Sequence, residues 1–389
     1  LAGGRADLEC PGEPAMTLKR LLVFAPTRRA ASETFIRANL RGLPFEVQAF
    51  FGDELPWRNP ERLAYGLAVV FSKILTRLGL LRLAGMPAAA VARLLMARHQ
   101  ADLVLAEFGF HAVRVMDAAK ATGVPLVVHF RGSDLSAQSK VGVLKSRYRH
   151  LLRFADGVIC KSEPMAQTLR QLGANPSRLL ISASGANTAL FYGSNPSQAA
   201  PVFLAVGRFV PKKGPLHTIR AFQQQPLGQL WMVGEGPLLL QAEALVQDLG
   251  LQDRVRFFGA LPQVKVAALM REARVFVQHS LVAADGDSEG NPVSVMEAQL
   301  SGLPVVATRH GGIPEVVLDQ QTGCLVEEGD VSGMAAAMQH LMADPLLAEC
   351  YGAAGRRQIL AGFTLEHHLQ DVTKFLEMVM DSHRLRLRA

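Results

Sequence analysis

Two carboxylates, Glu289 and Glu297, lie eight residues apart around a stretch that is typical of a helix start. Asn291 is a favoured N-cap residue, and Pro292 suits the first helical position because its missing N–H is not needed there. The backbone N–H groups of residues 290–294, at the positive end of the helix dipole, suit a phosphate. Because Glu289 repels a phosphate, we expect both acids to accept hydrogen bonds from hydroxyls, as a sugar nucleotide would offer. The alternative is an ordinary capped helix with incidental acids.

A basic turn at 207–214 is a second candidate site. It follows an apolar stretch at 202–206 that is typical of a strand, and ligands of open α/β sheets bind outside the carboxyl ends of strands. Arg208 can fork onto phosphate oxygens and Lys213 adds a point charge, so we expect both to hold a diphosphate. Lys212 is expected to be a solvated neighbour. The alternative is a basic surface turn.

Other candidates also stand near strand ends. His129 and Asp134 follow a predicted strand at 125–130, although a histidine at a strand end is more often structural than catalytic. Gly234 and Gly236 permit a tight turn. Their spacing does not match G-x-G-x-x-G, so a nicotinamide site finds no support.

The elements that position these residues are short apolar runs that alternate with helical patterns. Such strands imply parallel sheets covered by helices on both faces, and two series of them imply two Rossmann-like domains of an α/β protein. The predicted strands are 21–25, 47–50, 103–107, 125–130, 157–160, 179–182, 202–206, 230–233, 255–258, 275–278, 305–307 and 324–326.

The stretch from Glu289 to Ala298 matches every fixed position of E-G-x-P-x-x-x-x-E-A. It thereby resembles the Glu-x7-Glu motif of retaining glycosyltransferases, above all family 4 with its GT-B fold. Residues 207–214, 234–237 and 253–259 resemble the family's G-R-x…K-G, G-x-G-P and D-R-V-x-F-x-G blocks. The resemblance is dense from about residue 200 to 330 and thinner before it. It implies two Rossmann-like domains whose parallel sheets face each other across an interdomain cleft.

Several site residues follow from this resemblance. It implies catalytic roles for His129, Arg208, Lys213 and Glu289. It implies donor-binding roles for Gly207, Gly234, Gly236, Arg256, Gly290, Asn291, Pro292, Val293, Ser294 and Glu297. Candidates for contacts with the acceptor or the donor are Arg28, Thr34 and Asp134, the last of which could instead cap a helix.

No metal or other cofactor is expected. Asp285 and Asp287 spell the Asp-x-Asp pair that holds a divalent ion in the other glycosyltransferase fold. Here the pair lies in a glycine-containing loop, and Arg208 and Lys213 already supply positive charge. The sequence therefore predicts turnover without a catalytic metal.

The block from His129 to Asp134 resembles H-x-x-G-x-D of members that build exopolysaccharides, including the colanic-acid type, and lipid-linked oligosaccharides. The Ser-Glu-Thr-Phe piece at 32–35 is found in the same subgroup, whereas the family's usual Gly-Gly loop after the first strand is missing. The resemblance implies a retaining hexosyltransferase that moves a sugar from a nucleotide-diphosphate sugar to a hydroxyl acceptor. That acceptor is expected to be a lipid-linked or polysaccharide intermediate in cell-surface glycan synthesis.

Two alternatives from other classes stay open. A nucleotide-sugar epimerase shares the fold but needs further acids for proton transfer or elimination, and the first domain offers no such set. A non-catalytic nucleotide-sugar-binding subunit would be expected to lose Lys213, Glu289 or His129, and all three are present.

The expected division of the chain has five parts. Residues 1–15 are an extension outside the fold, and 16–186 form an acceptor-binding domain. A linker at 187–201, rich in Gly, Ser, Asn and Pro at its centre, leads to a nucleotide-sugar-binding domain at 202–362. In GT-B proteins a C-terminal helix crosses back to the first domain, and residues 363–389 could do so before a basic tail.

Composition points to a cytoplasmic protein. The four cysteines form no C-x-x-C pair, which suits a reducing compartment and argues against a zinc site, and no secretory signal is visible. Of the net charge of +7, the apolar segment 61–100 supplies +5. Its uncharged runs are too short to span a bilayer. Either it lies on an anionic membrane, peripheral on the cytoplasmic face of the inner membrane, or its helices pack on a sheet with solvated basic faces. A nucleic-acid partner is not expected, because no recognised motif accompanies the charge.

Overall fold

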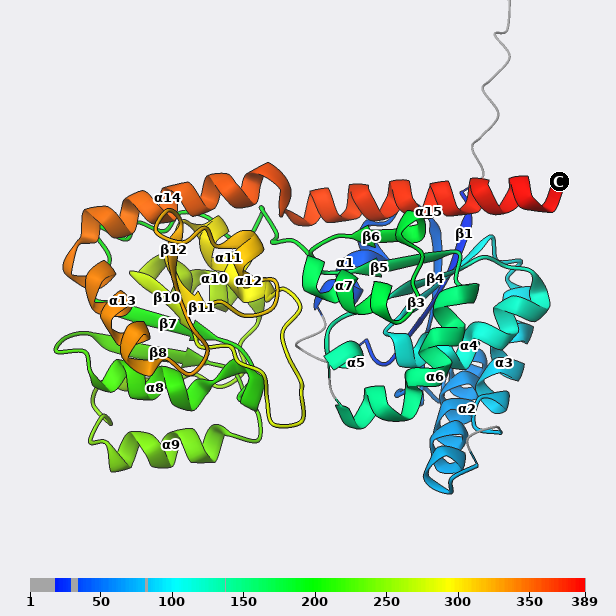
Figure 1. Cartoon of the computed structure of the whole chain (residues 1–389), viewed down its shortest axis with the longest axis horizontal. Helices are drawn as coiled ribbons and strands as arrows, with labels where there is room; N and C mark the ends of the chain where they lie inside the picture. The colour runs from blue at the N-terminus through cyan, green and yellow to red at the C-terminus, as the bar shows by residue number, and fades with distance from the viewer. Residues whose placement is uncertain (1–17, 29–33, 81–82, 137, 389) are drawn as a thin grey trace, which may run out of the picture.

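The computed structural model describes residues 18–28, 34–80, 83–136 and 138–388, so the extension expected at 1–15 lies outside the described residues. Two parallel six-stranded sheets lie side by side, each with helices on both faces (Figure 1). The first sheet contains β1 (Arg20–Ala25), β2 (Glu46–Phe51), β3 (Leu103–Glu107), β4 (Leu126–His129), β5 (Gly157–Cys160) and β6 (Leu179–Ile181). The second contains β7 (Val202–Val206), β8 (Gln229–Val233), β9 (Val255–Phe257), β10 (Val275–Gln278), β11 (Val305–Thr308) and β12 (Gly323–Val326).

The first sheet is apolar on both faces because both faces are covered. In β1, Leu21 and Val23 point into one core and Leu22 and Phe24 into the other, with at most 2% of any of them exposed. One core is closed by α1 (Thr34–Gly42) and α15 (Leu365–Arg388). The other is closed by α2 (Pro60–Arg77), α3 (Met86–Arg98), α4 (Gly109–Thr122), α6 (Gln138–Phe154) and α7 (Glu163–Gln171). The short helices α5 (Ser133–Ser136) and η1 (Pro176–Arg178) lie in connecting loops.

The second sheet is covered in the same way. One core holds Leu204 and Phe276 against α10 (Gln263–Glu272), α11 (Val293–Ser301), α12 (Ile313–Val316) and α14 (Pro345–Gly362). The other holds Phe203 and Val275 against α8 (Pro215–Gln223), α9 (Leu239–Asp248) and α13 (Val331–Ala343). A 3₁₀ turn, η2 (Pro211–Lys213), precedes α8.

The strand orders place a switch point in each sheet. The first sheet runs β2-β1-β3-β4-β5-β6, so the direction of winding changes between β1 and β3. The second runs β12-β11-β10-β7-β8-β9, so it changes between β7 and β10. Ligands of such sheets bind at these points, outside the carboxyl ends of the strands.

Two connections join the domains, and they hydrogen-bond to each other. The N–H of Ala186 donates to the carbonyl of Phe363, and the N–H of Leu365 donates to the carbonyl of Ala186. Gly185, with φ +69°, lies so close that a Cβ there would be 2.3 Å from the carbonyl oxygen of Thr364. Only glycine fits this crossing.

After the crossing, α15 runs along the first domain while α14 runs along the second (Figure 1). Its apolar residues Val372, Phe375, Leu376, Val379 and Met380 join the core against the first sheet. The helix continues to Arg388, so the basic residues expected in a tail belong to α15.

Candidate active site

A single cleft lies between the carboxyl ends of the two sheets. Its volume, including space open to solvent, is about 1590 Å³, larger than a typical small-molecule pocket. Its walls include Pro26, Thr27, Thr34, Phe35, Arg131, Ser133 and Lys161 of the first domain. The facing residues of the second domain include Gly207, Arg208, Lys212, Lys213, Gln263, Glu289, Asn291, Pro292, Val293, Ser294 and Glu297.

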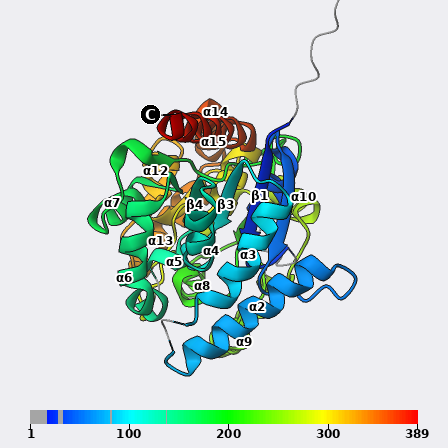
Figure 2. The same ribbon diagram turned by 90° about the vertical axis from the view of Figure 1, so that its right-hand side faces the viewer.

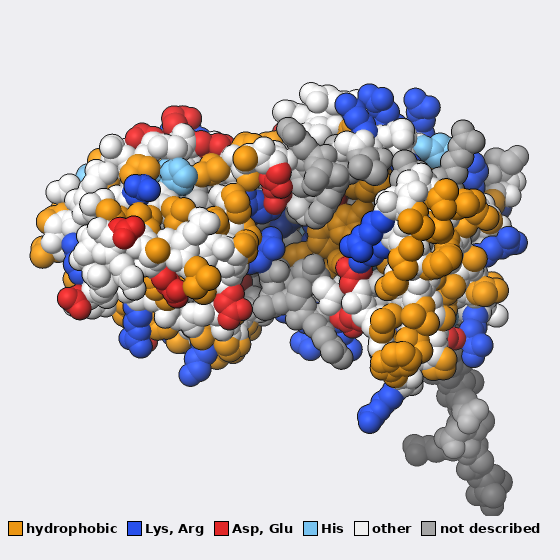
Figure 3. Space-filling model, turned by 90° about the horizontal axis from the view of Figure 1, so that it is seen from below, with side chains coloured by type: hydrophobic (Ala, Val, Ile, Leu, Met, Phe, Trp, Pro, Cys, Tyr) orange, Lys and Arg blue, Asp and Glu red, His pale blue; other side chains and the backbone are white. Residues whose placement is uncertain are grey.

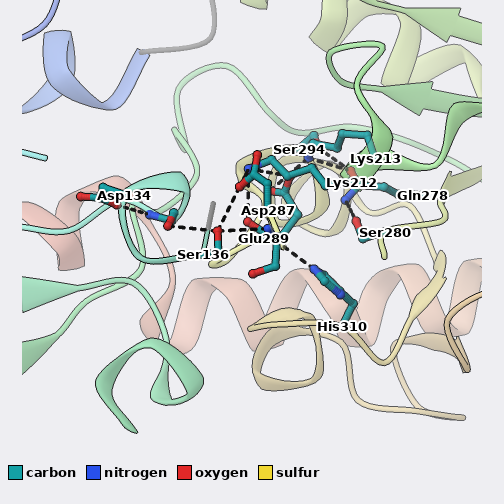
Figure 4. Close-up of polar contacts among 12 residues, drawn as sticks. Asp134, Ser136, Lys212, Lys213, Gln278, Ser280, Asp287, Glu289, Ser294 and His310 are labelled. Atoms are coloured by element: carbon teal, nitrogen blue, oxygen red, sulfur yellow. Dashed lines mark hydrogen bonds and ion pairs between the residues drawn. The ribbon is translucent and has the colours of Figure 1, made fainter. Parts of the chain in front are cut away.

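Glu289 stands in a cluster of ammonium groups (Figure 4). Its Oε2 lies 3.5 Å from Lys213 Nζ, and its Oε1 lies 3.8 Å from Lys212 Nζ. Burial alone would raise the pKa of Glu289, but Lys213, Lys212 and Lys161 outweigh burial and lower this pKa to about 2. Glu289 is therefore ionised at neutral pH and can only accept hydrogen bonds.

Lys213 lies at the switch point of the second sheet. Its Nζ is 3.3 Å from Oε1 of Gln278, at the end of β10, and Ser294 Oγ donates to the same oxygen at 3.1 Å (Figure 4). Burial lowers the pKa of Lys213, and the neighbouring carboxylate of Glu289 opposes that shift. The side chain of Arg208 is exposed and lines the cleft. Both cations thus stand where a diphosphate was expected.

Lys212 is not the solvated neighbour that the sequence suggested. Only 7% of the residue is exposed. Its Nζ lies 3.1 Å from Asp287 Oδ1 and donates to the carbonyl of Ser288 at 3.2 Å. Lys212 therefore holds the loop that carries Glu289, and the Asp-x-Asp carboxylate of Asp287 is already paired.

The start of α11 differs from the expectation by one residue. The helix begins at Val293 with Pro292 as its N-cap residue, so Asn291 does not cap it. Asn291 is 1% exposed, lines the cleft, and has no hydrogen-bond partner for either side-chain amide atom within the described part of the chain. The helix start and this amide both remain available to a ligand.

Glu297 stands on α11 at the far end of the cleft from the lysine cluster's loop. It is 7% exposed and accepts a hydrogen bond from Gln263 Nε2 at 2.9 Å. Burial raises the pKa of Glu297 to about 7, although Gln263 and Lys213 oppose the shift. The two acids of the opening motif therefore differ in charge near neutral pH.

The glycines and Arg256 lie around this wall rather than in it. A Cβ at Gly234 would be 2.0 Å from the carbonyl oxygen of Gly207, and one at Gly236 would be 2.5 Å from that of Phe209. These glycines thus let one loop pack behind the turn that carries Arg208. Arg256 is exposed, with its guanidinium 4.6 Å from the ring centroid of Phe258.

His129 is placed differently from the expectation that it contacts a donor sugar. The ring is fully buried, packs 5.8 Å from the ring of His368 on α15, and is not part of the cleft wall. Burial and the nearby Arg131 hold the pKa of His129 well below its usual range, so the ring is neutral. Because β4 directs this side chain into the domain, a direct contact with a donor is not possible in this arrangement.

Asp134 is also buried. Its carboxylate accepts hydrogen bonds from the N–H groups of Gly109, Arg131 and Gly132 at 2.8 to 3.0 Å. Of the two expected roles, the geometry agrees with the structural one, because Asp134 ties the loop before α5 to the start of α4. Burial raises the pKa of this carboxyl against the opposing hydrogen bonds.

Sequence reasoning missed two cations of the first domain, Arg131 and Lys161. Arg131 forms two hydrogen bonds with the buried carboxylate of Glu107, at 2.8 and 2.9 Å, and lies 4.2 Å above the ring of Phe35. Lys161 follows β5 and lines the cleft. Their position directly after strands at the cleft edge was the signal that could have found them.

The loop after β1 contributes less than its candidates suggested. Thr34 lines the cleft. Arg28 lines a separate depression beside Arg37 and Arg62, and its backbone N–H donates to Glu54 Oε1 at 2.5 Å. Within the described residues, no group of three His, Cys, Asp or Glu side chains could hold a metal ion.

Comparison with known proteins accounts for this arrangement. A sequence model of glycosyl transferases group 1 matches residues 190–358, and one of the glycosyl transferase 4-like domain matches residues 34–184. The chain belongs to the family-4 glycosyltransferases. It is 31% identical over 260 residues to a protein of Escherichia coli K12 named as colanic acid biosynthesis glycosyltransferase WcaL, with 64% of each chain covered. This places it with the exopolysaccharide-type members of the family.

Solved structures agree in fold. Sucrose-phosphate synthase of Thermosynechococcus elongatus superposes with a TM-score of 0.76 at 20% identity, covering 94% of this chain and all of that one. HepE of Anabaena in complex with UDP gives 0.70 at 19% identity, covering 93% and 100%. The fold is GT-B, with two Rossmann-like domains. The sequence matches to WcaL proteins span less than two thirds of those relatives' own length.

In this family-4 glycosyltransferase the domains also touch along one side of the cleft (Figure 4). Ser136 of the first domain donates to Asp287 at 3.0 Å and accepts from the N–H of Ser288 at 3.1 Å. Glu315, expected to cap or pack a helix, accepts from the N–H of Glu163 at the start of α7 at 2.7 Å. The carboxylate of one domain thus caps a helix of the other.

Proposed function

We propose that this protein is a retaining glycosyltransferase, which moves a sugar from a nucleotide-diphosphate sugar to a hydroxyl acceptor in cell-surface polysaccharide synthesis. One observation carries the proposal. Arg208, Lys213, Glu289 and Glu297 come from separate segments, yet all four line one cleft together with the start of α11. That set matches the parts of the donor, because cations suit its diphosphate and carboxylates suit its hydroxyls.

The diphosphate is held by Arg208, Lys213 and the first N–H groups of α11. Catalysis then depends on charge that accumulates on the departing diphosphate, which these groups stabilise in advance. Removal of one such preorganised donor costs other enzymes about 3–4 kcal/mol in the transition state. No metal is needed in this scheme, since the cations supply the charge and Asp287 is occupied by Lys212. Turnover that is lost in EDTA and restored by Mg²⁺ would contradict this point.

The reaction exchanges two bonds at one carbon. The bond between the anomeric carbon and the diphosphate oxygen breaks, and a bond to the acceptor oxygen forms on the same face of the sugar. The acceptor's proton passes to the departing phosphate oxygen, so no side chain has to act as nucleophile or base. Glu289, paired with Lys213, accepts hydrogen bonds from the transferred sugar, and Glu297 accepts them from the ribose.

The likeness to WcaL, whose name assigns it to colanic acid synthesis, supports a glycan or lipid-linked acceptor. The likeness to HepE, solved with UDP, supports a nucleoside-diphosphate donor. The first domain forms the acceptor side of the cleft, through Phe35 and Ser133.

A thermal-shift panel of nucleotide sugars tests the donor. A ligand at a hundred times its dissociation constant stabilises the folded state by about 2.7 kcal/mol, and Lys213→Met should abolish the shift. The donor that is found is then incubated with lipid-linked acceptors. Formation of a glycosylated product supports a transferase, conversion of the donor sugar alone identifies an epimerase, and binding without either product identifies a non-catalytic subunit.

We also propose that the first domain binds the surface of an anionic membrane on its cytoplasmic side. Helices α2 and α3 lie side by side at the outer end of that domain (Figure 2). Hydrophobic side chains gather there, with Lys and Arg around them (Figure 3). Among the described residues, none of the helices has the length and hydrophobicity to span a bilayer. The patch is formed by Leu67, Val70, Phe71, Ile74, Leu78, Leu80, Leu83, Met86 and Leu94, all at least 39% exposed.

The patch is amphipathic by helical spacing. In α2, Tyr65 and Val69 are buried, whereas Phe71 and Leu78 face outward one and two turns further on. The exposed Arg77 and Arg93 flank this face and would pair with acidic lipids at about 1 kcal/mol each. Arg82 lies outside the described residues. Apolar insertion and electrostatic attraction together favour a bilayer over a purely polar partner.

Vesicle co-flotation tests this surface with phosphatidylcholine alone and with added phosphatidylserine. Binding to the anionic vesicles should weaken with salt, with Arg77→Gln plus Arg93→Gln, and with Phe71→Gln plus Leu78→Gln. Arg220→Gln and Leu240→Gln, both at exposed positions of the second domain, serve as controls. Equal binding to neutral vesicles would contradict the electrostatic part, and no binding to either would contradict the proposal.

A further inference from the structure

Lys161 is a cation of the cleft that the scheme above does not use. It directly follows β5, is only 7% exposed, and lines the cleft between the domains. Its Nζ lies 5.5 Å from the ring centroid of Phe35, and its Cβ would be 3.6 Å from a Cβ built on Gly290. Lys161 therefore stands on the first domain's wall, beside the loop that carries Glu289.

The ammonium of Lys161 has no anionic partner in the described part of the chain. The other buried cations of the cleft do: Arg131 pairs with Glu107, and Lys212 and Lys213 pair with Asp287 and Glu289. Burial of a charge without a partner is costly, so such groups are normally paired. A buried, unpaired lysine that faces a cleft indicates an anion that belongs to the ligand.

The balance of charge indicates which anion. When each ion pair counts as neutral, two cations of the cleft are left within the described residues, Arg208 on the second domain and Lys161 on the first. A diphosphate diester carries two negative charges. Glu289 is ionised but shared by Lys212 and Lys213, so it does not neutralise Lys161 as well.

We propose that Lys161 is the first domain's contact with the diphosphate of the donor, so that a single anion is held from both walls of the cleft. The inference rests on the proposed function, which supplies the diphosphate, and adds a residue that touches the departing group. It also gives the donor a part in joining the domains, because Arg208 and Lys161 belong to different ones.

The surroundings of Lys161 make this contact dependent on pH. Burial, with Arg131, Lys213 and Lys212 nearby, lowers the pKa of Lys161 to about 7, and Glu289 opposes the shift. The buried rings of His129 and His368, which lie behind this wall, have lowered pKa values and are neutral. The ammonium is thus charged below about pH 7 and loses its proton above it, so the affinity for a diphosphate should fall as the pH rises.

Calorimetric titration with pyrophosphate, UDP, GDP and ADP tests the assignment on the whole chain. Lys161→Met should weaken pyrophosphate and the preferred nucleotide by about 10- to 100-fold, the range of a hydrogen bond to a charged group. Arg208→Met should do the same, Lys161→Arg should stay within a few-fold of the unaltered protein, and the exposed Lys265→Met should change nothing. Melting temperatures of all variants control for folding.

A second titration series uses the preferred nucleotide sugar, which has no terminal phosphate to ionise, from pH 6 to 8.5. The unaltered protein should lose affinity across this range, whereas Lys161→Arg, which stays charged, should have a flat profile. This comparison also holds if Lys161→Met fails to fold. Parallel profiles for the two proteins would overturn the assignment.

The outcomes separate the two proposals. If the unaltered protein binds none of the nucleotides or pyrophosphate, the proposed function is wrong. If it binds them, Arg208→Met weakens binding and Lys161→Met does not, the proposed function stands and Lys161 does not contact the diphosphate. Weakening by both variants, with retention by Lys161→Arg, supports the contact.

Discussion

The two domains have parallel sheets of the same size, but they build their sides of the cleft differently. In the second domain the site comes from two short segments, 207–213 and 289–297, and its charges pair with one another across them, as Lys213 does with Glu289. In the first domain Phe35, Arg131 and Lys161 come from three elements far apart in sequence. A motif can describe the first kind of site, whereas only the fold assembles the second.

The first domain's wall also depends on the C-terminal helix. Arg131 is held by Glu107, and Glu107 accepts from Asn39 Nδ2 at 3.0 Å. Asn39 Oδ1 lies 3.2 Å from His368 Nε2, and His368 Nδ1 lies 2.8 Å from Ser182 Oγ. A buried polar network thus runs from α15 to the cleft. Networks of this kind fix geometry only while every member is satisfied.

The largest effect is expected from the second domain's preformed charge. Lys213→Met removes an ammonium that faces the cleft and leaves Glu289 with one fewer partner. We expect kcat/KM to fall by about 10²- to 10³-fold, as for loss of one preorganised group elsewhere. Initial rates with the identified donor measure this, and Lys265→Met is the matched control. A loss below tenfold would mean that the two walls contribute equally.

The two acids of the second domain should separate binding from chemistry. Glu297 is proposed to hold the ribose, whose contacts hardly change during reaction, so Glu297→Ala should mainly raise the donor KM, by about tenfold. Glu289 faces the transferred sugar, so Glu289→Ala should mainly lower kcat, by about 10²-fold. Glu289→Gln should be milder, because its amide oxygen still accepts. Full kcat in Glu289→Ala with weaker donor binding would remove Glu289 from the reacting sugar.

The donor KM should also depend on pH through Glu297. Its pKa of about 7 means that the carboxylate is protonated below neutral pH and then accepts fewer hydrogen bonds. KM should therefore rise as the pH falls from 8 to 6, and Glu297→Gln should lose that dependence.

Sequence patterns predicted the strands well and the buried polar groups poorly. Each of the predicted strands overlaps a strand of the sheets, because continuous apolar runs have few other solutions in a covered parallel sheet. The exposure of Lys212 was wrong and the place of His129 differs from the expectation. Whether a side chain after a strand faces the cleft or the domain depends on the register with neighbouring loops, such as the contact of Lys212 with Asp287. That contact joins residues 75 positions apart.

The buried network should make the first domain sensitive to acid. His368 is 2% exposed, and burial, with Arg131 and Lys161 nearby, lowers its pKa to about 3. The unfolded chain binds a proton near pH 6.5 that the folded chain refuses, so stability falls as the pH drops from 6.5 towards 3. We expect a loss of about 1 kcal/mol between pH 6.5 and 5.5 from this histidine.

Chemical denaturation at several pH values measures that slope. His368→Gln should be less stable at pH 7 but should have a shallower dependence on pH than the unaltered protein. The exposed His340→Gln, in the second domain, controls for histidine loss in general. Equal slopes in all three proteins would show that the network does not exclude the proton.

The smallest effect is expected where the two domains meet outside the cleft. Glu315 of the second domain accepts from the N–H of Glu163 at the start of α7, so a carboxylate stands at the positive end of a helix dipole. Loss of a helix cap costs about 1 kcal/mol, which would lower the closed population several-fold. Glu315→Ala should therefore raise the radius of gyration in X-ray scattering and reduce turnover several-fold, while Glu315→Gln, which keeps an acceptor oxygen, should do less. Glu349→Ala, at an exposed position of α14, is the control. If scattering and turnover are unchanged in Glu315→Ala, the domains are held together by Ser136 and the loop at 287–290 without help from this cap.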